Sequence, residues 1–459
     1  MKRYLIDFLA CFVIAALATL FHGCDDFVEI APPRTELIQQ TVFADDNTAE
    51  AAVTDIYFTL KSNGFASGGA TSISLLTSFS SDEQICYPAN SAMAYQQFNN
   101  NDLQPDNGFI DILWSDMYRV IFKANAVLEG LSVSHGVSEG VKSRLAGEAR
   151  FIRAFCYFYL VNLWGDVPLI LTTNYRENNR PLRIPVEDVY RKIIDDLRYA
   201  AVVLPADYGI SAGERVRVNK WAATALLART YLYREQWSDA EAMASLLIDH
   251  SEMFSLESDL AKVFRRTSRE AIFQLWSQEF PLDRSSFAVY FFGPLYGAMR
   301  PSYIESYAAG DQRWAIWGKN VVVDSAIYPC YFKYKDYAVP PLDYSTVLRL
   351  AEQYLIRAEA RLRQQKLMAA REDIDIIRHR AELAGTSSRT ENALFADVIA
   401  ERKSELATEW GHRWFDLKRW RMANEILGPI KSGWSANDVL FPIPADQIRD
   451  NPSILQNPG

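Results

Sequence analysis

The chain has 459 residues, a formal net charge of −9 at pH 7 and five cysteines. The acidic balance argues against a protein that binds nucleic acid, or that binds anionic lipid headgroups through charge. The cysteines are widely spaced and form no C-x-x-C pair, so the sequence predicts neither a disulfide framework nor a zinc site. The length is ample for a large hydrophobic core and exceeds that of one average domain.

Residues 1–23 have the pattern of a bacterial lipoprotein signal peptide. Lys2 and Arg3 supply the positive end, and 8–21 is almost wholly apolar but too short to span a bilayer as an anchor. Cys24 follows directly, and we expect its thiol to accept a lipid group and to begin the mature chain. No later apolar run approaches the roughly 20 residues of a membrane span, so the membrane is expected to be reached only through this N-terminal lipid. An ordinary secretory signal with a chance cysteine is the alternative.

Apolar residues recur at intervals of three and four along most of the remaining chain, which predicts a mostly α-helical fold. The segment 148–164 is apolar nearly all the way round, so we expect a buried helix there, ended by Gly165 and Pro168. Pro185 and Pro205 bracket the helix that follows. The predicted helices are 48–61, 112–131, 139–164, 185–204, 218–235, 238–250, 344–364, 367–381 and 391–409.

Two pairs of these helices share one spacing of small residues. Ala228 and Ala240 lie 12 residues apart across a short helix–turn–helix, and Ala358 and Ala370 repeat this spacing 130 residues later. Small residues at such points allow two antiparallel helices to pack closely, as they do in tetratricopeptide hairpins. Together with the number of helices, the repeat favours a scaffold of helical pairs.

Two long stretches, 64–108 and 279–341, lack the helical pattern. The first is rich in Ser, Asn and Gly, and the second is rich in aromatic residues, Pro and Gly. Irregular segments of this length are unusual inside compact domains and tend to be functional. Short strands at 271–276 and 320–323 are expected to form small hairpins, and the chain ends in a proline-punctuated tail over 441–458.

Ordered motifs along nearly the whole chain after Cys24 resemble those of one family, the SusD/RagB nutrient-binding lipoproteins of Bacteroidetes-type bacteria. Asp25 and Asp26 resemble the signal that sends such lipoproteins to the outer cell surface. The motifs are specific for the family and carry no information about the ligand. They are GEARFIRA at 147–154, LWGDVPL at 163–169, SREAIF at 268–273, GDQR at 310–313, RAEA at 357–360, the charged run 401–416 and FPIP at 441–444.

The resemblance implies a tetratricopeptide-like helical-pair scaffold with long irregular loops and a few short β-hairpins. It also implies a cell-surface, lipid-anchored protein of the outer membrane that captures an oligosaccharide. The implied partner is a SusC-like TonB-dependent transporter, over which the lipoprotein sits as a hinged lid. The chain would then comprise a SusD-like N-terminal region over 24–255 and a RagB/SusD C-terminal region over 256–459.

Sugar binding requires flat apolar faces for the pyranose rings and planar polar groups for the hydroxyls. Aromatic residues at helical spacing are expected in the core, so the two irregular stretches supply the ligand-binding candidates. These candidates follow from loop position and side-chain chemistry, because the family does not fix its ligand residues by motif. The aromatic candidates are Tyr87, Tyr95, Phe98, Tyr290, Phe292, Tyr296 and Trp317, and the polar ones are Asp82, Asn90, Gln96, Asn99 and Arg300.

Other functions stay open at this point. Glu405 and its neighbours at 401 and 409 share a helix face with a spacing that would suit a retaining glycosidase. Arg402 and Arg413 lie among them and favour buried ion pairs instead, so we expect no catalysis. A peptide-binding uptake lipoprotein of RagB type and a scaffold that docks only partner proteins are further alternatives. No two histidines have metal-ligand spacing, and 99–108 favours a solvated turn over a calcium site, so no metal or cofactor is expected.

Overall fold

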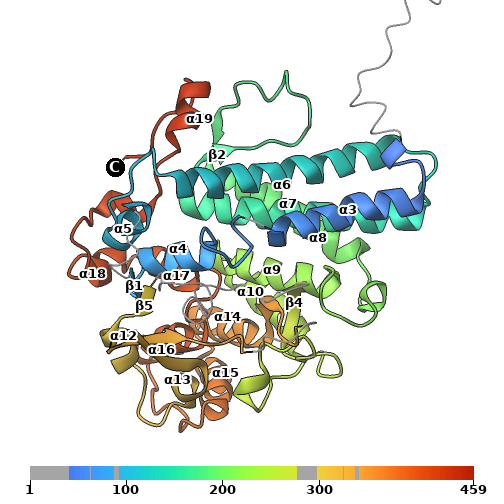
Figure 1. Cartoon of the computed structure of the whole chain (residues 1–459). Coiled ribbons are helices and arrows are strands. Elements are labelled where there is room, and N and C mark those ends of the chain that lie inside the picture. Colours follow the sequence, from blue (N-terminus) through green and yellow to red (C-terminus); the bar gives the residue numbers. More distant parts are fainter. Residues whose placement is uncertain are drawn as a thin grey trace, which may run out of the picture.

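The computed structural model describes residues 41–62, 64–86, 93–276, 297–323, 325–335 and 341–458. These residues form a mostly helical protein, as the sequence predicts (Figure 1). The longer helices are α3 (Asp46–Ser62), α4 (Ile73–Ser80), α5 (Met93–Asn100), α6 (Gly108–Val133), α7 (Glu139–Trp164), α8 (Val186–Val203), α9 (Lys220–Tyr233), α10 (Trp237–Ile248), α14 (Leu350–Arg363), α15 (Leu367–Arg380), α16 (Glu391–Glu405) and α17 (His412–Arg419). The shorter ones are α12 (Pro301–Glu305), α13 (Gln312–Trp317), α18 (Ala423–Leu427) and α19 (Ala445–Asp450).

Local sequence signals explain where the long helices begin and end. The side chain of Asn107 accepts a hydrogen bond from the first turn of α6, and Asn219 does the same for α9. Helix α7 has the predicted bounds, and it ends at Gly165, whose φ of +73° is unfavourable for other residues. The buried character predicted for this helix is confirmed, because its last turns are enclosed on all sides.

The helices pack in chain order. Helix α6 packs on α7, α7 on α8, α8 on α9 and α9 on α10, and α10 then packs directly on α14 although 249–349 lies between them in the sequence. The repeated small residues Ala228, Ala240, Ala358 and Ala370 are all fully buried. This confirms the tetratricopeptide-like scaffold of helical pairs.

The described strands form two-stranded antiparallel ladders. The predicted hairpin around 320–323 is confirmed as the pair β6–β7. The expected hairpin at 271–276 is wrong, because β4 pairs with the distant strand β8. The pairs are β1 (Gln84–Cys86) with β5 (Gly297–Met299), β2 (Val167–Pro168) with β3 (Arg183–Ile184), β4 (Ala271–Leu275) with β8 (Ser345–Arg349), and β6 (Gly318–Val323) with β7 (Ala326–Tyr331).

Other predicted bounds are corrected by the structure. The predicted helix 344–364 begins as strand β8, which is buried along its whole length. Such a strand shows no alternation of apolar and polar residues, so it reads like the start of a buried helix. Helix α16 ends at Glu405, and the turn after it contains Thr408, Trp410 and Gly411 at positive φ.

The first stretch predicted to be irregular contains helices α4 and α5. Helix α4 is fully buried, and half of its residues are Ser or Thr, which are weak helix formers. The Thr77 hydroxyl donates to the carbonyl of Ile73 at 2.6 Å, and Ser80 donates to Leu76 at 3.2 Å, so these polar groups are satisfied inside the helix itself. No helix among the described residues is long and apolar enough to cross a membrane.

Candidate functional site

The β1–β5 ladder joins the two stretches that sequence analysis singles out. Cys86 at the end of β1 pairs with Gly297 at the start of β5. Cys86 belongs to the first of these stretches and Gly297 to the second, so the ladder brings the two stretches together at this pair. Paired residues in an antiparallel ladder have Cα atoms roughly 4.5–5.5 Å apart. We call this place, defined by Cys86 and Gly297, the ladder end.

Helix α5 and the C-terminal part of the chain hold the ladder end in place. The Asn99 side-chain oxygen accepts a hydrogen bond from the backbone N–H of Cys86 at 3.0 Å. The Lys431 ammonium, buried beneath α5, donates to the carbonyl of Asn99 at 2.9 Å and also to that of Phe79. Gly433 donates its N–H to Asn100 at 3.1 Å. The ladder end is therefore supported by segments that lie more than 300 residues apart in the sequence.

Acidic residues just before β1 anchor the ladder to α17 and to the turn after α16. Asp82 accepts two hydrogen bonds from Arg413, at 2.7 and 2.9 Å. Burial opposes ionisation of Asp82, but the charge of Arg413 outweighs it, so the pKa of this carboxyl is lowered. Glu83 accepts the N–H of Thr408 at 2.6 Å, and burial raises its pKa to about 7 in spite of that bond.

Three of the predicted aromatic contacts are core residues. Tyr95 and Phe98 lie in α5 and Trp317 lies in α13, and their exposed fractions are 4%, 0% and 0%. The Tyr95 hydroxyl donates to the carbonyl of Ala70, and the Trp317 indole N–H donates to that of Leu260 at 2.8 Å. Sequence analysis placed these rings in loops, and that placement is wrong. None of the three presents a ring face in this structure.

The described polar candidates separate into two kinds. Asp82 and Asn99 are engaged in the support just described. The side chains of Gln96 and Arg300 have no hydrogen-bond partner among the residues that the structure describes, and the Arg300 Nε is buried. Burial lowers the pKa of Arg300, while the nearby Asp82 acts in the opposite direction. Gln96 and Arg300 therefore keep donors available for a ligand. Cys24, Tyr87, Asn90, Tyr290, Phe292 and Tyr296 lie outside the described residues.

The carboxylates at the end of α16 and in the turn after it are held in buried ion pairs, as the sequence interpretation favours. Arg349 donates to Glu405 at 2.6 Å and to Glu409 at 2.7 Å, and Glu405 also accepts from Arg380. Arg402 pairs in the same way with Asp416 at 2.7 Å. Burial opposes ionisation of Glu405, but Arg380 and Arg349 hold its pKa well below its usual range. Such a carboxylate is a poor proton donor.

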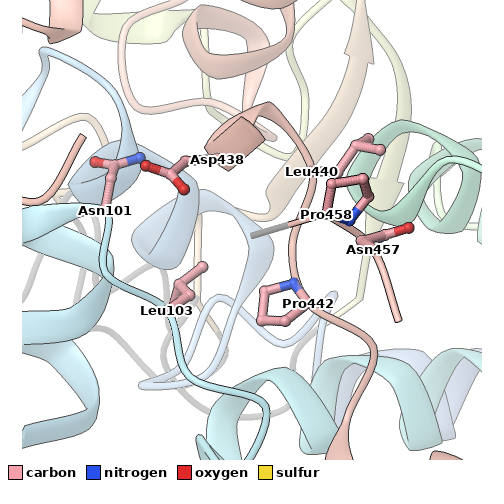
Figure 2. Close-up of a pocket in the computed structure, with 7 residues that line it drawn as sticks. All are labelled: Asn101, Leu103, Asp438, Leu440, Pro442, Asn457 and Pro458. Atoms are coloured by element: carbon pink, nitrogen blue, oxygen red, sulfur yellow. The ribbon is translucent and has the colours of Figure 1, made fainter. Parts of the chain in front are cut away.

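The described residues contain no group of three acidic, histidine or cysteine side chains placed to hold a metal ion. A small cavity beside the C-terminal tail has a volume of about 30 Å³ (Figure 2). Asn101, Asp438 and Asn457 lie on its wall, and the side-chain oxygen of Asn101 is buried without a protein partner. This space suits a water molecule and is too small for a sugar.

The structure also contains a larger groove, which the sequence does not predict. It has a volume of about 420 Å³ and lies along α6, beside Trp114, Tyr118 and Phe122. Aromatic residues at helical spacing were expected in the core, yet Phe122 is 51% exposed. The sequence signal that could have revealed this groove is the aromatic series 114, 118 and 122, which lies on one face of a helix. In the structure this face lines the groove together with the amides of 178–179.

Two family models match the chain. Residues 32–232 match a model described as "Starch-binding associating with outer membrane", and residues 342–459 match one described as "SusD family". Together these matches cover more than half of the chain. The "SusD-like protein P25" of Formosa agariphila is 26% identical to it, with 95% of each chain covered.

Solved structures have the same fold. A SusD superfamily protein from Bacteroides vulgatus superposes with a TM-score of 0.78 at 20% identity, over 90% of this chain and 99% of that one. Surface glycan-binding protein A from Bacteroides thetaiotaomicron, solved in complex with laminarihexaose, gives a TM-score of 0.76 at 20% identity with the same coverage. The helical-pair scaffold, the two family models and the relative of matching length together show that this chain belongs to the SusD/RagB family.

Proposed function

We propose that this protein binds an oligosaccharide at the surface of the outer membrane and holds it without cleaving it. The observation that carries the proposal is the ladder end, where Cys86 of the first predicted ligand-binding stretch pairs with Gly297 of the second. The glycan complex of a structural relative and the family description "Starch-binding associating with outer membrane" support the ligand class and the location.

The proposed contacts are the aromatic candidates of 87–92 and 277–296, which lie outside the described residues, together with the free polar groups of Gln96 and Arg300. Tyr87 and Tyr296 are the residues adjacent in sequence to the paired Cys86 and Gly297. Rings supply stacking faces for pyranose units, and amide and guanidinium groups donate to hydroxyls. A protein that passes its ligand on must also release it, so we expect micromolar to millimolar affinity.

The binding test is a calorimetric titration with four neutral hexaoses: laminarihexaose, maltohexaose, cellohexaose and mannohexaose. Single Tyr87→Ala, Tyr290→Ala and Tyr296→Ala variants should each weaken binding about fivefold, since a stacked ring contributes roughly 1 kcal/mol. Phe58→Ala is the matched control, because Phe58 is 65% exposed and belongs to α3, which lies apart from β1 and β5 in Figure 1. Equal affinity of all three tyrosine variants and the wild type would rule out the ladder end as the binding site.

The same samples separate the alternatives. Release of new reducing ends from a bound hexaose would favour the glycosidase, whereas the ion pairs of Glu405 support binding without turnover. Heat released with a tryptic peptide mixture, and with none of the hexaoses, would favour the peptide-binding function. We further propose a SusC-like transporter as the partner, with this protein as its hinged lid.

A further inference from the structure

The groove along α6 is built from three segments that are distant in the sequence. One wall is the face of α6 that carries Trp114, Tyr118 and Phe122, and the others are residues 168–181 and α19. Its volume of about 420 Å³ is within the range of small-molecule sites. In Figure 1, α19 and β2 lie at one end of the molecule, apart from β1 and β5. The groove is thus separate from the ladder end.

Hydrogen bonds fix the walls of the groove before any ligand arrives. The Tyr118 hydroxyl donates to the carbonyl of Pro168 at 2.8 Å, which ties α6 to the end of β2, where the segment 168–181 begins. The Asn451 amide donates to the carbonyl of Pro181 at 2.8 Å, which ties the end of α19 to the same segment. A preformed groove loses little conformational entropy when it binds, and this favours affinity.

The lining combines aromatic rings with uncharged amides. Trp114 and Tyr118 have ring centroids 5.1 Å apart, and Phe122 next to them is 51% exposed. The side-chain amides of Asn179 and Gln447 face the same space and have no hydrogen-bond partner among the described residues.

The groove is almost free of charge. The one charged side chain among the described lining residues is Asp450, which pairs with Arg449 at 3.3 Å. An anionic ligand would find no cation in this lining, and a cationic ligand would find only a carboxylate that is already paired. Apolar ring faces with free amides and a single, paired carboxylate suit a neutral polyhydroxylated chain.

We propose that the groove along α6 is a second binding site for a neutral oligosaccharide, in addition to the site at the ladder end. The Phe122 ring is the stacking surface, and the amides of Asn179 and Gln447 contact the sugar hydroxyls. The inference does not depend on the ladder end, because its residues and supporting contacts are different.

The test follows isoleucine methyl groups by NMR while the four neutral hexaoses are added to the full-length mature protein, each up to 10 mM. Ile170 and Ile454 line the groove, and Ile85 lies in β1. Assignment uses single Ile→Val variants. We expect the Ile170 and Ile454 signals to shift with at least one hexaose. Phe122→Ala and Gln447→Ala should weaken this binding about three- to tenfold, and Phe58→Ala should leave it unchanged.

The outcomes distinguish the two sites. Shifts at Ile85 alone overturn the groove as a sugar site and leave the ladder end intact. Shifts at Ile170 and Ile454 alone support the groove and count against the ladder end. The inference is overturned if neither groove signal shifts with any of the four hexaoses. It is also overturned if the shifts are the same in Phe122→Ala and the wild type. Because Phe122 and Gln447 are not core residues, both variants are expected to fold.

Discussion

Arg349 shows how single residues in this chain keep charge buried. Its guanidinium is only 2% exposed and donates to Glu270, Glu405 and Glu409 at 2.9, 2.6 and 2.7 Å. Arg380 pairs with two of the same carboxylates, so each charge has more than one partner. Removing one member of such a group leaves an uncompensated buried charge, which costs about 3–5 kcal/mol. These buried ion pairs therefore contribute to the stability of the folded protein.

Glu83 differs from these paired carboxylates, because burial raises its pKa and keeps its carboxyl group protonated to an unusually high pH. Its folded pKa of about 7 lies above the ordinary value of 4.5. Between these values the folded protein holds a proton that the unfolded chain has released. Folding then takes up a proton, and the stability from this group falls as the pH rises. The total change is of the order of 3 kcal/mol.

We therefore expect Glu83→Gln to flatten the pH dependence of stability between pH 5 and pH 7. The amide oxygen can still accept the Thr408 N–H, and the variant has no charge to bury. The measurement is the free energy of unfolding in urea at half-unit pH steps. Glu405, whose pKa is lowered, affects stability only below about pH 5, so its contribution lies outside this window. An unchanged slope in Glu83→Gln would show that another group is responsible.

Among the elements, the β1–β5 pair is the one on which the candidate site depends. A Cβ atom at Gly297 would lie 2.3 Å from the Phe79 ring and 2.8 Å from the carbonyl oxygen of Ile85. Phe79 is fully buried, and Ile85 belongs to the partner strand, so neither can move without cost. The absence of a side chain at Gly297 is what allows the two strands and α4 to meet.

Gly297→Ala should separate the ladder end and weaken oligosaccharide binding there, with a loss of about 1–3 kcal/mol of stability. Gly140→Ala is the matched control, because its Cβ would meet no atom within 4 Å in the first turn of α7. That control should be neutral or more stable by up to about 1 kcal/mol. Calorimetric titration and thermal unfolding of both variants give the comparison. Wild-type behaviour of Gly297→Ala would contradict the role given to the ladder.

The same elements show what the sequence can predict. Helix α7 was predicted with its observed bounds because its signals are local: apolar residues along it and Gly165 at its end. Strand β8 was missed because its pairing partner β4 lies about 70 residues earlier and no local period marks it. At the site, the two stretches were identified by composition, but Tyr95 and Trp317 were misplaced. Their burial depends on α5 and α13, short helices stabilised by tertiary packing rather than by propensity.

At the scale of the whole molecule, ion pairs cross the predicted boundary at residue 255. Arg229 on α9 donates to Glu352 on α14 at 2.6 and 2.7 Å, and both side chains are buried. Arg361 on α14 reaches back to Glu241 on α10 at 3.1 Å. These contacts join the two predicted regions, so a lid motion would move the body as a unit. The connection of such a lid to the membrane would be the leader between Cys24 and Thr41, and a chain of this length spans at most about 60 Å when fully extended.

If the proposed lipid anchor and transporter partner are correct, a tether of this length would keep the folded protein close to the transporter and would raise its effective concentration there. We expect Cys24→Ala to leave the membrane fraction and to lose copurification with a TonB-dependent barrel from solubilised outer membranes. Its calorimetric affinity for a hexaose should equal that of the wild type, since the binding residues are unchanged. Cys11→Ala is the control, because Cys11 lies inside the predicted signal peptide. Cys24→Ala could instead remain in the membrane fraction and still copurify with the barrel. That result would show that surface contacts of the folded protein, rather than the lipid, attach it to the membrane and form the lid hinge.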